Sequence, residues 1–323
     1  MGVVAAVALA GAATLTVLRF VDTSARLPVM ATSFASYAVL GFLLALVLLV
    51  VLVPRAGRLR PVVIAGLVLA LVGAVAHGYW LAPLFAGASG ARTDLVVMTS
   101  NLRFGDGDPN TVVRAAADQK VDVLVLEEVT PTELAALDRA GLDELLPHRA
   151  GEPATTAIGT MVFTHYPLRG ARAIALGNGG LAVDVRAPRP FQLLAVHTLQ
   201  PVNAVTGWHD DLAEVRRQAT DAVGAGATMV VGDFNATRDH PAFRAILDVG
   251  LRDAAEQADA GWQPTWPTGS RAWYLRPVIA IDHVLVTEDF AAVRTGTVDV
   301  EDTDHLGLVA ELDRRRQAAG QPP

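Results

Sequence analysis

The chain has 323 residues, of which 52% are hydrophobic, and it contains no cysteine, which excludes disulfides, thiol nucleophiles and thiolate metal sites. Its charge is divided unevenly: residues 1–93 contain six arginines and one aspartate, a net charge of +5, whereas residues 94–323 contain 20 basic and 32 acidic residues, a net charge of −12. An acidic domain is a poor match for the phosphate backbone of a nucleic-acid duplex, whose binding depends on Lys and Arg.

Three uncharged stretches near the N-terminus predict transmembrane helices. No charged side chain occurs in the first 18 residues, in Leu27–Pro54 or in Pro61–Ala91. The second and third stretches contain the roughly 20 apolar residues that a spanning helix needs; the first is short, and a cleaved signal peptide is its alternative. Buried helices of a soluble domain would have a polar face, which these stretches lack. We therefore expect a transmembrane region over residues 1–85, with helices at about residues 3–20, 31–53 and 62–83.

Arginines in the short link between the second and third helices predict the orientation of this region. Arg55, Arg58 and Arg60 lie in that link, and positively charged loops tend to stay in the cytoplasm. The third helix then leads out, so everything after it is expected outside the cytoplasm, whether or not the first helix is removed. Arg19 and Arg26, in what would be the external loop, are the contrary indication.

The rest of the chain reads as a linker at residues 86–93, an α/β domain at residues 94–313 and a polar tail at residues 314–323. Strand-like runs alternate with fewer helical runs, which favours a layered α/β domain with substantial sheet. The expected strands are Asp94–Asn101, Val121–Glu128, Gly159–Thr164, Leu181–Val185, Phe191–His197, Thr228–Asp233, Ile281–Val286 and Gly307–Leu312. The expected helices are Pro109–Gln119, Pro131–Ala140, Gly207–Val223 and Pro241–Asp248.

Polar residues stand repeatedly at the ends of these apolar strands, which is where open sheets place their sites. One such residue is an ordinary loop residue, but six occurrences in series, all Asn, Asp, Glu or His, indicate a functional site. They are Asn101, Glu128, His197, Asp233 with Asn235, Asp282 with His283, and Asp304 with His305.

Six segments resemble, in this order, the motifs of the endonuclease/exonuclease/phosphatase superfamily: SNLRFG, DVLVLEEV, AVHTLQP, VVGDFNATRDHPAF, IDHVLV and TDHLGLVAEL. The superfamily includes secreted deoxyribonuclease I, abasic-site endonucleases, neutral sphingomyelinases and inositol polyphosphate phosphatases. The resemblance covers about Asp94–Leu312, and GDFN and the late Asp-His pair are its most specific parts. It implies an α/β fold, a four-layered α/β sandwich of the deoxyribonuclease I type, which here is preceded by the three expected transmembrane helices.

The resemblance also implies a divalent cation, Mg²⁺ or Mn²⁺, as the cofactor. Hydrolysis of a phosphodiester requires neutralised non-bridging oxygens, an activated water and a stabilised leaving oxygen, and a hard cation with oxygen ligands provides the first and the last. The implied metal-binding residues are Glu128, with Asn101 beside it, and Asp304.

Five further residues have catalytic roles by the same resemblance. Asp233 would orient or deprotonate the attacking water, and Asn235 would hydrogen-bond the scissile phosphate. His305 would contact the phosphate as a cation or proton donor, oriented by Asp282. His197 would stabilise the transition state from the opposite side.

The sequence departs from the superfamily pattern at places that bear on the substrate. Glu127 replaces the usual Gln, so it is either a second carboxylate of the site or a structural residue that points away along the strand. FTHYPLRG replaces a segment that usually contains Ser-Arg-Tyr-Pro, which leaves Thr164 as a tentative substrate-binding residue. Trp273 and Tyr274 are equally expected to line the substrate or to pack in the core.

Together these features predict a membrane-anchored, metal-dependent phosphoester hydrolase that acts outside the cytoplasm by in-line attack of water on a phosphodiester or phosphomonoester. Its expected partners are a phosphoester, either a lipid headgroup or a nucleic acid, and the lipid bilayer, with no obligate protein partner. A membrane-tethered extracytoplasmic nuclease is the alternative, and a non-enzymatic membrane scaffold is disfavoured by the complete residue set. Fold membership alone does not identify the substrate.

Overall fold

The computed structural model describes residues 1–87, 90–269 and 276–315. These residues form two compact units. The helical unit consists of residues 1–83 with residues 238–241, and the catalytic unit consists of residues 84–237 with the described residues from 242 onward.

The helical unit contains α1 (Gly2–Leu18), α2 (Arg26–Thr32), α3 (Ala38–Leu52) and α4 (Arg60–Leu81), joined in part by short 3₁₀ turns. Two stretches of this unit, Ala35–Arg55 with 21 residues and Gly57–Leu84 with 28, are long and apolar enough to cross a membrane. The expectation of three such helices is therefore corrected to two, because α1 has only 17 residues, short of the roughly 20 that a span needs. The second span also begins later than expected, since the chain turns at Ser33 and Phe34 before α3.

Polar and aromatic contacts join the C-terminal ends of α1 and α4. The Oγ1 of Thr16 lies 2.9 Å from Nε2 of His77, and the guanidinium of Arg19 stacks over the Trp80 ring at 4.8 Å. Within the same unit, Asp239 forms an ion pair with Arg19, so the charge of this arginine is neutralised. Helices α1 and α4 therefore run in the same direction, and α3 runs opposite to them. The link that contains Arg55, Arg58 and Arg60 precedes α4 and lies at the end of this helix away from Trp80.

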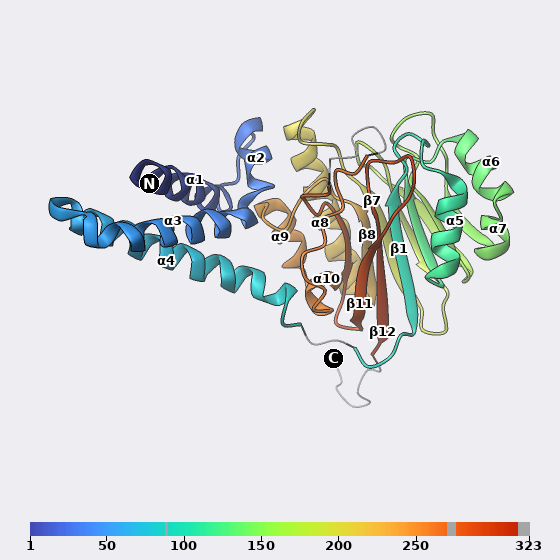
Figure 1. The fold of residues 1–323 in the computed structure, drawn as a ribbon. Helices are drawn as coiled ribbons and strands as arrows, with labels where there is room; N and C mark the ends of the chain where they lie inside the picture. Colours follow the sequence, from blue (N-terminus) through green and yellow to red (C-terminus); the bar gives the residue numbers. More distant parts are fainter. Residues whose placement is uncertain (88–89, 270–275, 316–323) are drawn as a thin grey trace. The chain divides into compact units, whose positions relative to one another are not determined.

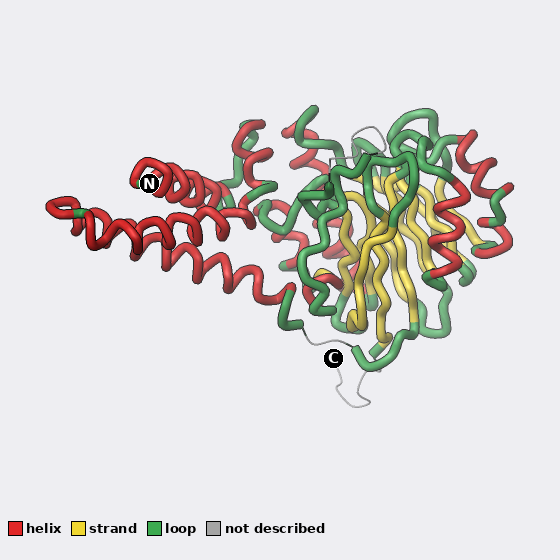
Figure 2. Tube along the Cα trace, viewed as in Figure 1, coloured by secondary structure: helices red, strands yellow, loops and turns green. Residues whose placement is uncertain are grey.

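The catalytic unit contains two six-stranded sheets (Figures 1 and 2). In spatial order, the first sheet has β11 (Phe290–Val298), β12 (Gly307–Arg314), β1 (Leu95–Asn101), β2 (Val123–Glu127), β4 (Met161–Thr164) and β3 (His148–Gly151). The second sheet has β5 (Leu168–Ile174), β6 (Gly180–Val185), β7 (Phe191–His197), β8 (Thr228–Asp233), β10 (Asp282–Val286) and β9 (Arg252–Asp253).

The sheets pack face to face and helices cover their outer faces. The core between them contains Val97 and Val125 from the first sheet and Leu193 and Val231 from the second. The outer face of the first sheet packs against α5 (Pro109–Asp118), α6 (Pro131–Arg139) and α7 (Leu142–Leu145). On the second sheet α8 (Val205–Ala225) contacts β7 and β8, and two shorter helices follow, α9 (Pro241–Leu247) and α10 (Ala254–Gln257).

Helix starts follow the local sequence. Asp108 accepts hydrogen bonds from the backbone N–H groups of Asn110 and Thr111 and so caps α5, and Thr130 caps α6 by accepting from the N–H of Glu133. Each helix has proline at its first position, where the missing N–H is not needed. These caps begin both helices at the residues expected from the sequence.

Each of the eight expected strands has an observed counterpart, but β3, β5, β9 and β11 were not expected. β5 is an edge strand whose side chains are mostly exposed and which contains Arg169 and Arg172, so it lacks the alternation of apolar and polar residues that identifies a half-buried strand. β12 continues to Arg314, two residues past the expected end at Leu312.

Pairing of the strands brings the polar strand ends to one edge of the sandwich. β1 and β2 are parallel, and so are β7 and β8. Asn101 lies opposite Glu127 in the first sheet, and in the second Asp233 lies opposite both His197 and Asp282. The carboxyl ends of the four parallel strands therefore carry the polar residues.

Gly232 allows β8 to approach the first sheet at this edge. Its φ is +139°, and a Cβ added there would overlap the carbonyl oxygen of Val196 and lie 2.8 Å from Oε1 of Glu127. We expect Gly232→Ala to lower the free energy of unfolding of the catalytic unit by at least about 2 kcal/mol, because both a strained φ and an overpacked contact result. Urea denaturation followed by tryptophan fluorescence measures this.

Gly224→Ala is the matched control, since Gly224 lies in α8 with open space where its Cβ would be. It should leave stability unchanged or raise it slightly through helix propensity. Equal stabilities of the two variants would contradict this account of Gly232.

Candidate functional site

The amide of Asn101 joins the two sheets at the edge where the polar residues gather. Its Nδ2 lies 3.2 Å from Oε1 of Glu128 in the first sheet and 3.2 Å from Oδ2 of Asp233 in the second. Nε2 of His197 is 3.5 Å from the same nitrogen. Because an amide nitrogen has two hydrogens, Asn101 can donate to both carboxylates at once and so set the distance between them.

Glu128 leaves the strand in an unusual backbone conformation. Its φ is +60°, which is uncommon for a residue other than glycine and is found where the surrounding structure stabilises it. The backbone N–H of Phe104 donates to Oε2 of Glu128 at 2.7 Å, and burial raises the pKa of this carboxyl above its usual value. The carboxylate is thus held at the end of β2 by neutral donors, without a cation of the described chain paired to it at hydrogen-bond distance.

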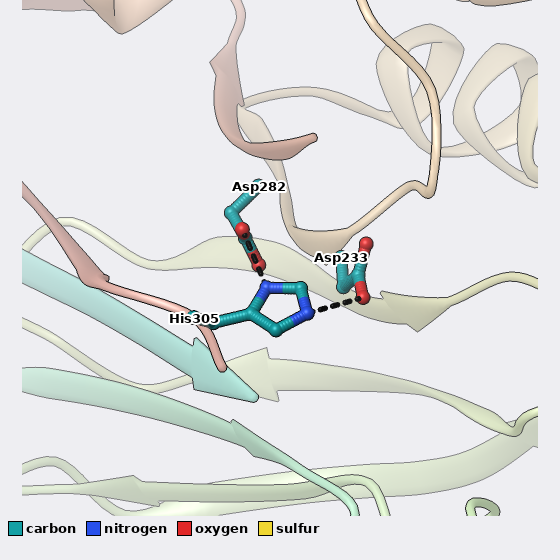
Figure 3. Close-up of side chains that lie close together, drawn as sticks. All are labelled: Asp233, Asp282 and His305. Carbon is teal, nitrogen blue, oxygen red and sulfur yellow. Dashed lines mark hydrogen bonds and ion pairs between the residues drawn. The ribbon is translucent and has the colours of Figure 1, made fainter. Parts of the chain in front are cut away.

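His305 lies between two buried aspartates of the second sheet (Figure 3). Its Nδ1 is 2.9 Å from Oδ2 of Asp282, and its Nε2 is 3.8 Å from Oδ2 of Asp233. Burial alone lowers the pKa of His305, but the charges of Asp282 and Asp233 outweigh this and raise it to about 10. The imidazole therefore holds both protons near neutral pH, with one oriented by Asp282.

Asp233 is buried and receives its own hydrogen bonds. Burial and the charge of Asp282 raise its pKa to about 7. The backbone N–H of Asn235 donates to Oδ1 at 2.7 Å, while Nδ2 of Asn235 donates to the carbonyl oxygen of Thr198 at 3.0 Å. Phe234, between the two polar residues, is fully buried in the core, as the alternation along the chain predicts.

His197 is neutral in this arrangement. Burial, followed by the charge of His305, lowers its pKa to about 3. Its Nε2 faces the site, at 3.6 Å from Oδ2 of Asp233 and 3.7 Å from Oε1 of Glu128.

Asn178 is a residue of the site that sequence reasoning missed. Its Nδ2 lies 3.3 Å from Nε2 of His197 and donates to the carbonyl oxygen of Thr198 at 3.1 Å. In the sequence it stands in ALGNGG, which reads as a turn, and no motif marks it.

Asp211, also missed, holds the loops on both sides of His197. This residue of α8 is buried, and its carboxylate accepts hydrogen bonds from the N–H of Gly177 at 3.0 Å and from the N–H of Leu199 at 2.8 Å. In the run HDDLAEV it is indistinguishable from a surface helix residue, because its partners are 12 and 34 residues away.

Two groups of residues could hold a metal ion. Asp233, Asp282 and His305 have ligand atoms within 4.8 Å of one another, and the His305 imidazole lies close to both aspartates. The other group is the expected one, with the Glu128 carboxylate, the Asn101 amide and Asp304. Asp304 accepts a hydrogen bond from Nε1 of Trp266 at 3.3 Å, and its charge raises the pKa of Glu128.

The second group contains no imidazole. It offers carboxylate and amide oxygens, the ligands that Mg²⁺ and Mn²⁺ prefer. The charge of Asp304 raises the pKa of Glu128, and a cation between the two carboxylates would stabilise their ionised forms. An oxygen of Asp282, Oδ1, is buried without a hydrogen-bond partner in the described structure and is available to a bound water.

Thr164, which is the expected substrate-binding residue that the structure describes, does not lie at the site. Thr164 is fully buried and pairs with Val123 at the start of β2, whereas the site lies past the end of that strand at Glu127. This position results from β4 running antiparallel to β2, so its last residue is farthest from the site. Trp273 and Tyr274 lie outside the described residues.

Glu127 is structural in position, since its side chain points between the sheets. Its Oε1 accepts a hydrogen bond from Thr99 at 2.8 Å and its Oε2 is buried without a partner. Burial, with the charge of Asp282, raises the pKa of Glu127 well above its usual value. The neutral acid then resembles the Gln that the superfamily usually has here.

We expect Glu127→Gln to stabilise the catalytic unit increasingly as pH rises. Above about pH 4.5 the unfolded chain loses the proton of Glu127 while the folded chain keeps it, so wild-type stability falls with rising pH until the folded pKa is reached. The variant lacks this loss, so the difference between its free energy of unfolding and that of the wild type should grow by up to about 1.4 kcal/mol per pH unit. Urea denaturation at pH 5.5 and 8 in EDTA measures the difference.

The exposed Glu144 supplies the control. Glu144→Gln should differ from the wild type by the same small amount at both pH values. An advantage of Glu127→Gln that does not change with pH would show that this carboxyl titrates normally in the folded protein.

Comparison with known proteins places this arrangement in a family. Residues 98–305 match the model of the Endonuclease/Exonuclease/phosphatase family, while no protein of curated function matches the sequence. A mannosyl-6-phosphatase of Bacteroides thetaiotaomicron has a similar structure, with 16% identity, a TM-score of 0.54, and coverage of 68% of this chain and 100% of its own.

Two further structures are similar. D. rerio TDP2 complexed with a single-strand DNA product has 14% identity and a TM-score of 0.55, and the match covers 68% of this chain and 98% of that one. An endonuclease/exonuclease/phosphatase from Beutenbergia cavernae has 23% identity and a TM-score of 0.51, with 68% and 72% covered. The family model spans the residues from β1 to His305, and on this match the chain belongs to the endonuclease/exonuclease/phosphatase family.

Proposed function

We propose that this phosphoester hydrolase is metal-dependent, is anchored in a membrane by its N-terminal helices and acts outside the cytoplasm. The observation that carries the metal dependence is the accumulation of carboxylates at one end of the sandwich. Glu128, Asp233, Asp282 and Asp304 gather there, and among the described residues of the cluster His305 is the one that carries a positive charge. Buried like charges of this kind are stabilised by a cation.

The expected metal-binding residues are Glu128, Asn101 and Asp304. A bound Mg²⁺ or Mn²⁺ would neutralise the non-bridging oxygens of the phosphate and stabilise the leaving oxygen. Asn101 has two roles in this proposal. Its amide oxygen is the metal ligand, and its amide nitrogen donates hydrogen bonds to Glu128 and Asp233. These hydrogen bonds fix the position of the metal-binding residues relative to Asp233 of the second sheet.

Asp233 and His305 provide the proton chemistry in this proposal. A carboxylate with its pKa near 7 can accept a proton from an attacking water at neutral pH. The protonated His305, held by Asp282, presents its Nε2–H toward the same space and can donate to a phosphate oxygen. Asn178 and Asn101 hold His197 beside Asp233, where it can contact the phosphate from the other side.

We expect the full chain in detergent micelles to hydrolyse bis-p-nitrophenyl phosphate with Mg²⁺ or Mn²⁺, and EDTA to abolish the activity reversibly. Asp233→Asn and His305→Gln should each lower kcat/KM by at least about 10²-fold, the scale of losing a positioned acid–base group. His165→Gln is the matched control, since its side chain is exposed. Activity that persists in EDTA, or near-normal rates of both site variants, would contradict the proposal.

The helical unit supports the membrane anchor. Many of its large apolar side chains are exposed, among them Val47 at 62%, Leu44 at 48% and Val72 at 59%, and exposed apolar surface of this extent is unfavourable in water. The charge of Arg19, one of the two arginines that oppose the proposed orientation, is paired within the unit, which leaves Arg26 against Arg55, Arg58 and Arg60.

The absence of cysteine allows the orientation to be tested with single-cysteine variants. In intact cells we expect a membrane-impermeant maleimide to label Ala173→Cys, on the exposed edge strand β5, and to label Leu59→Cys, in the link before α4, only after lysis. Labelling of Leu59→Cys alone in intact cells would reverse the orientation. Leu59 is 67% exposed, so failure to react cannot be due to burial in the protein.

A nuclease is the second candidate function, favoured by the similarity to a TDP2 structure that contains a DNA product. The net charge of −12 over residues 94–323 opposes it, because binding of nucleic acid depends on cationic side chains. A short single-stranded oligonucleotide that is cleaved faster than small phosphoesters would favour the nuclease.

A further inference from the structure

Exposed large apolar side chains are few in the catalytic unit, and they are not scattered. Among its described residues they are Phe85, Phe104, Ile158 and Val202. Phe85 lies in the segment that follows α4. The other three lie on three different loops, and each of these loops contacts the residues of the site.

Phe104 lies directly beside Glu128. Its backbone N–H donates to that carboxylate at 2.7 Å, its φ is +56°, and its side chain is 57% exposed. A left-handed backbone conformation at an aromatic residue is unfavourable. Phe104 therefore keeps an unfavourable backbone conformation while its aromatic ring is exposed to solvent.

Ile158 lies in the loop between β3 and β4, next to the other side of the site. The backbone of this loop pairs with Val129, the residue after Glu128, through Ala154 and Gly159. The carbonyl oxygen of Ile158 lies against Gly179, where an added Cβ would be only 2.6 Å away. The loop thus packs against the turn that contains Asn178, while the Ile158 side chain is 54% exposed.

Val202 lies in the loop that follows β7. That loop begins at Thr198, whose N–H donates to the carbonyl oxygen of Asp233 and whose own carbonyl accepts from Asn178 and Asn235. Val202 is 36% exposed. Three loops that hydrogen-bond the residues of the site or their neighbours therefore each carry one exposed apolar side chain.

We propose that Phe104, Ile158 and Val202 form an apolar rim that contacts the hydrocarbon part of a lipid phosphoester at the surface of a bilayer. This inference rests on the proposed hydrolase function and adds its substrate class. A phosphate bound near Glu128 and His305 leaves the rest of the substrate to extend past the rim. Contact with the apolar side chains of the rim stabilises the bound substrate only if that remainder is apolar too.

Charge near the rim favours a neutral or zwitterionic lipid over a polyanion. Asp106, in the loop of Phe104, and Glu152, in the loop of Ile158, are both exposed. These exposed carboxylates outnumber Arg103, the half-buried cation of the Phe104 loop, and so disfavour a nucleic-acid backbone and anionic lipids.

The test uses two phosphodiesters with the same scissile ester, methyl p-nitrophenyl phosphate and hexadecyl p-nitrophenyl phosphate. The full chain is reconstituted in nanodiscs of phosphatidylcholine, and kcat/KM is measured for each ester. We expect the wild type to favour the hexadecyl ester by at least about tenfold. The triple variant Phe104→Ser, Ile158→Ser, Val202→Ser should lose most of this preference.

Phe85→Ser is the matched control, because Phe85 is as exposed as Phe104, at 60%, but lies outside the rim. It should keep the preference, which separates the rim from the simple partitioning of the ester into the disc. Equal kcat/KM for both esters in the wild type, or a preference that survives in the triple variant, would overturn the inference.

The outcomes also separate the inference from the hydrolase function on which it rests. Turnover of the methyl ester without chain-length preference leaves the hydrolase intact and removes the lipid substrate. A single-stranded oligonucleotide that inhibits turnover of the hexadecyl ester more strongly than dispersed phosphatidylcholine would assign the rim to nucleobases and overturn the lipid. No metal-dependent turnover of either ester would overturn both proposals.

Discussion

The site depends on one amide side chain that forms hydrogen bonds to residues of both sheets. Asn101 ends a strand of the first sheet, yet its Nδ2 donates to Asp233 of the second sheet as well as to Glu128 of its own. The two sheets must therefore meet at a fixed distance at this edge. The small residue Gly232 allows this approach, and the neutral, buried Glu127 fills the space beneath it.

The electrostatics of the cluster follow from this packing. Carboxylates brought out of water and close to one another resist ionisation, so the pKa values of Glu128 and Asp233 rise. The charges of Asp282 and Asp233 outweigh burial and raise the pKa of His305. The same burial keeps His197 neutral. Glu128 of the first sheet thus offers oxygen ligands, whereas the second sheet offers a proton acceptor in Asp233 beside the protonated His305. Hydrolysis of a phosphoester can use both kinds of group.

Much of this arrangement could be predicted from the sequence, because its signals are local. Strands such as Phe191–His197 are continuous apolar runs that end in a polar residue, and the ends of parallel strands share an edge. Asn178 and Asp211 could not be found in this way, since their roles arise from contacts between distant segments. Thr164 was misplaced because its distance from the site depends on the antiparallel direction of β4, which no local pattern shows. The first apolar stretch likewise gave a helix of 17 residues, and its end is visible only in the structure.

We propose that a divalent cation binds to Glu128, Asn101 and Asp304, and not to Asp233, Asp282 and His305. Titration with Mn²⁺ followed by electron paramagnetic resonance, on the full chain without substrate, tests it directly. We expect Glu128→Gln to weaken Mn²⁺ binding at least about tenfold, and Asp282→Asn to bind Mn²⁺ nearly as the wild type does. Loss of binding in Asp282→Asn with binding retained in Glu128→Gln would contradict it and would place the ion among the residues that are here assigned to proton transfer.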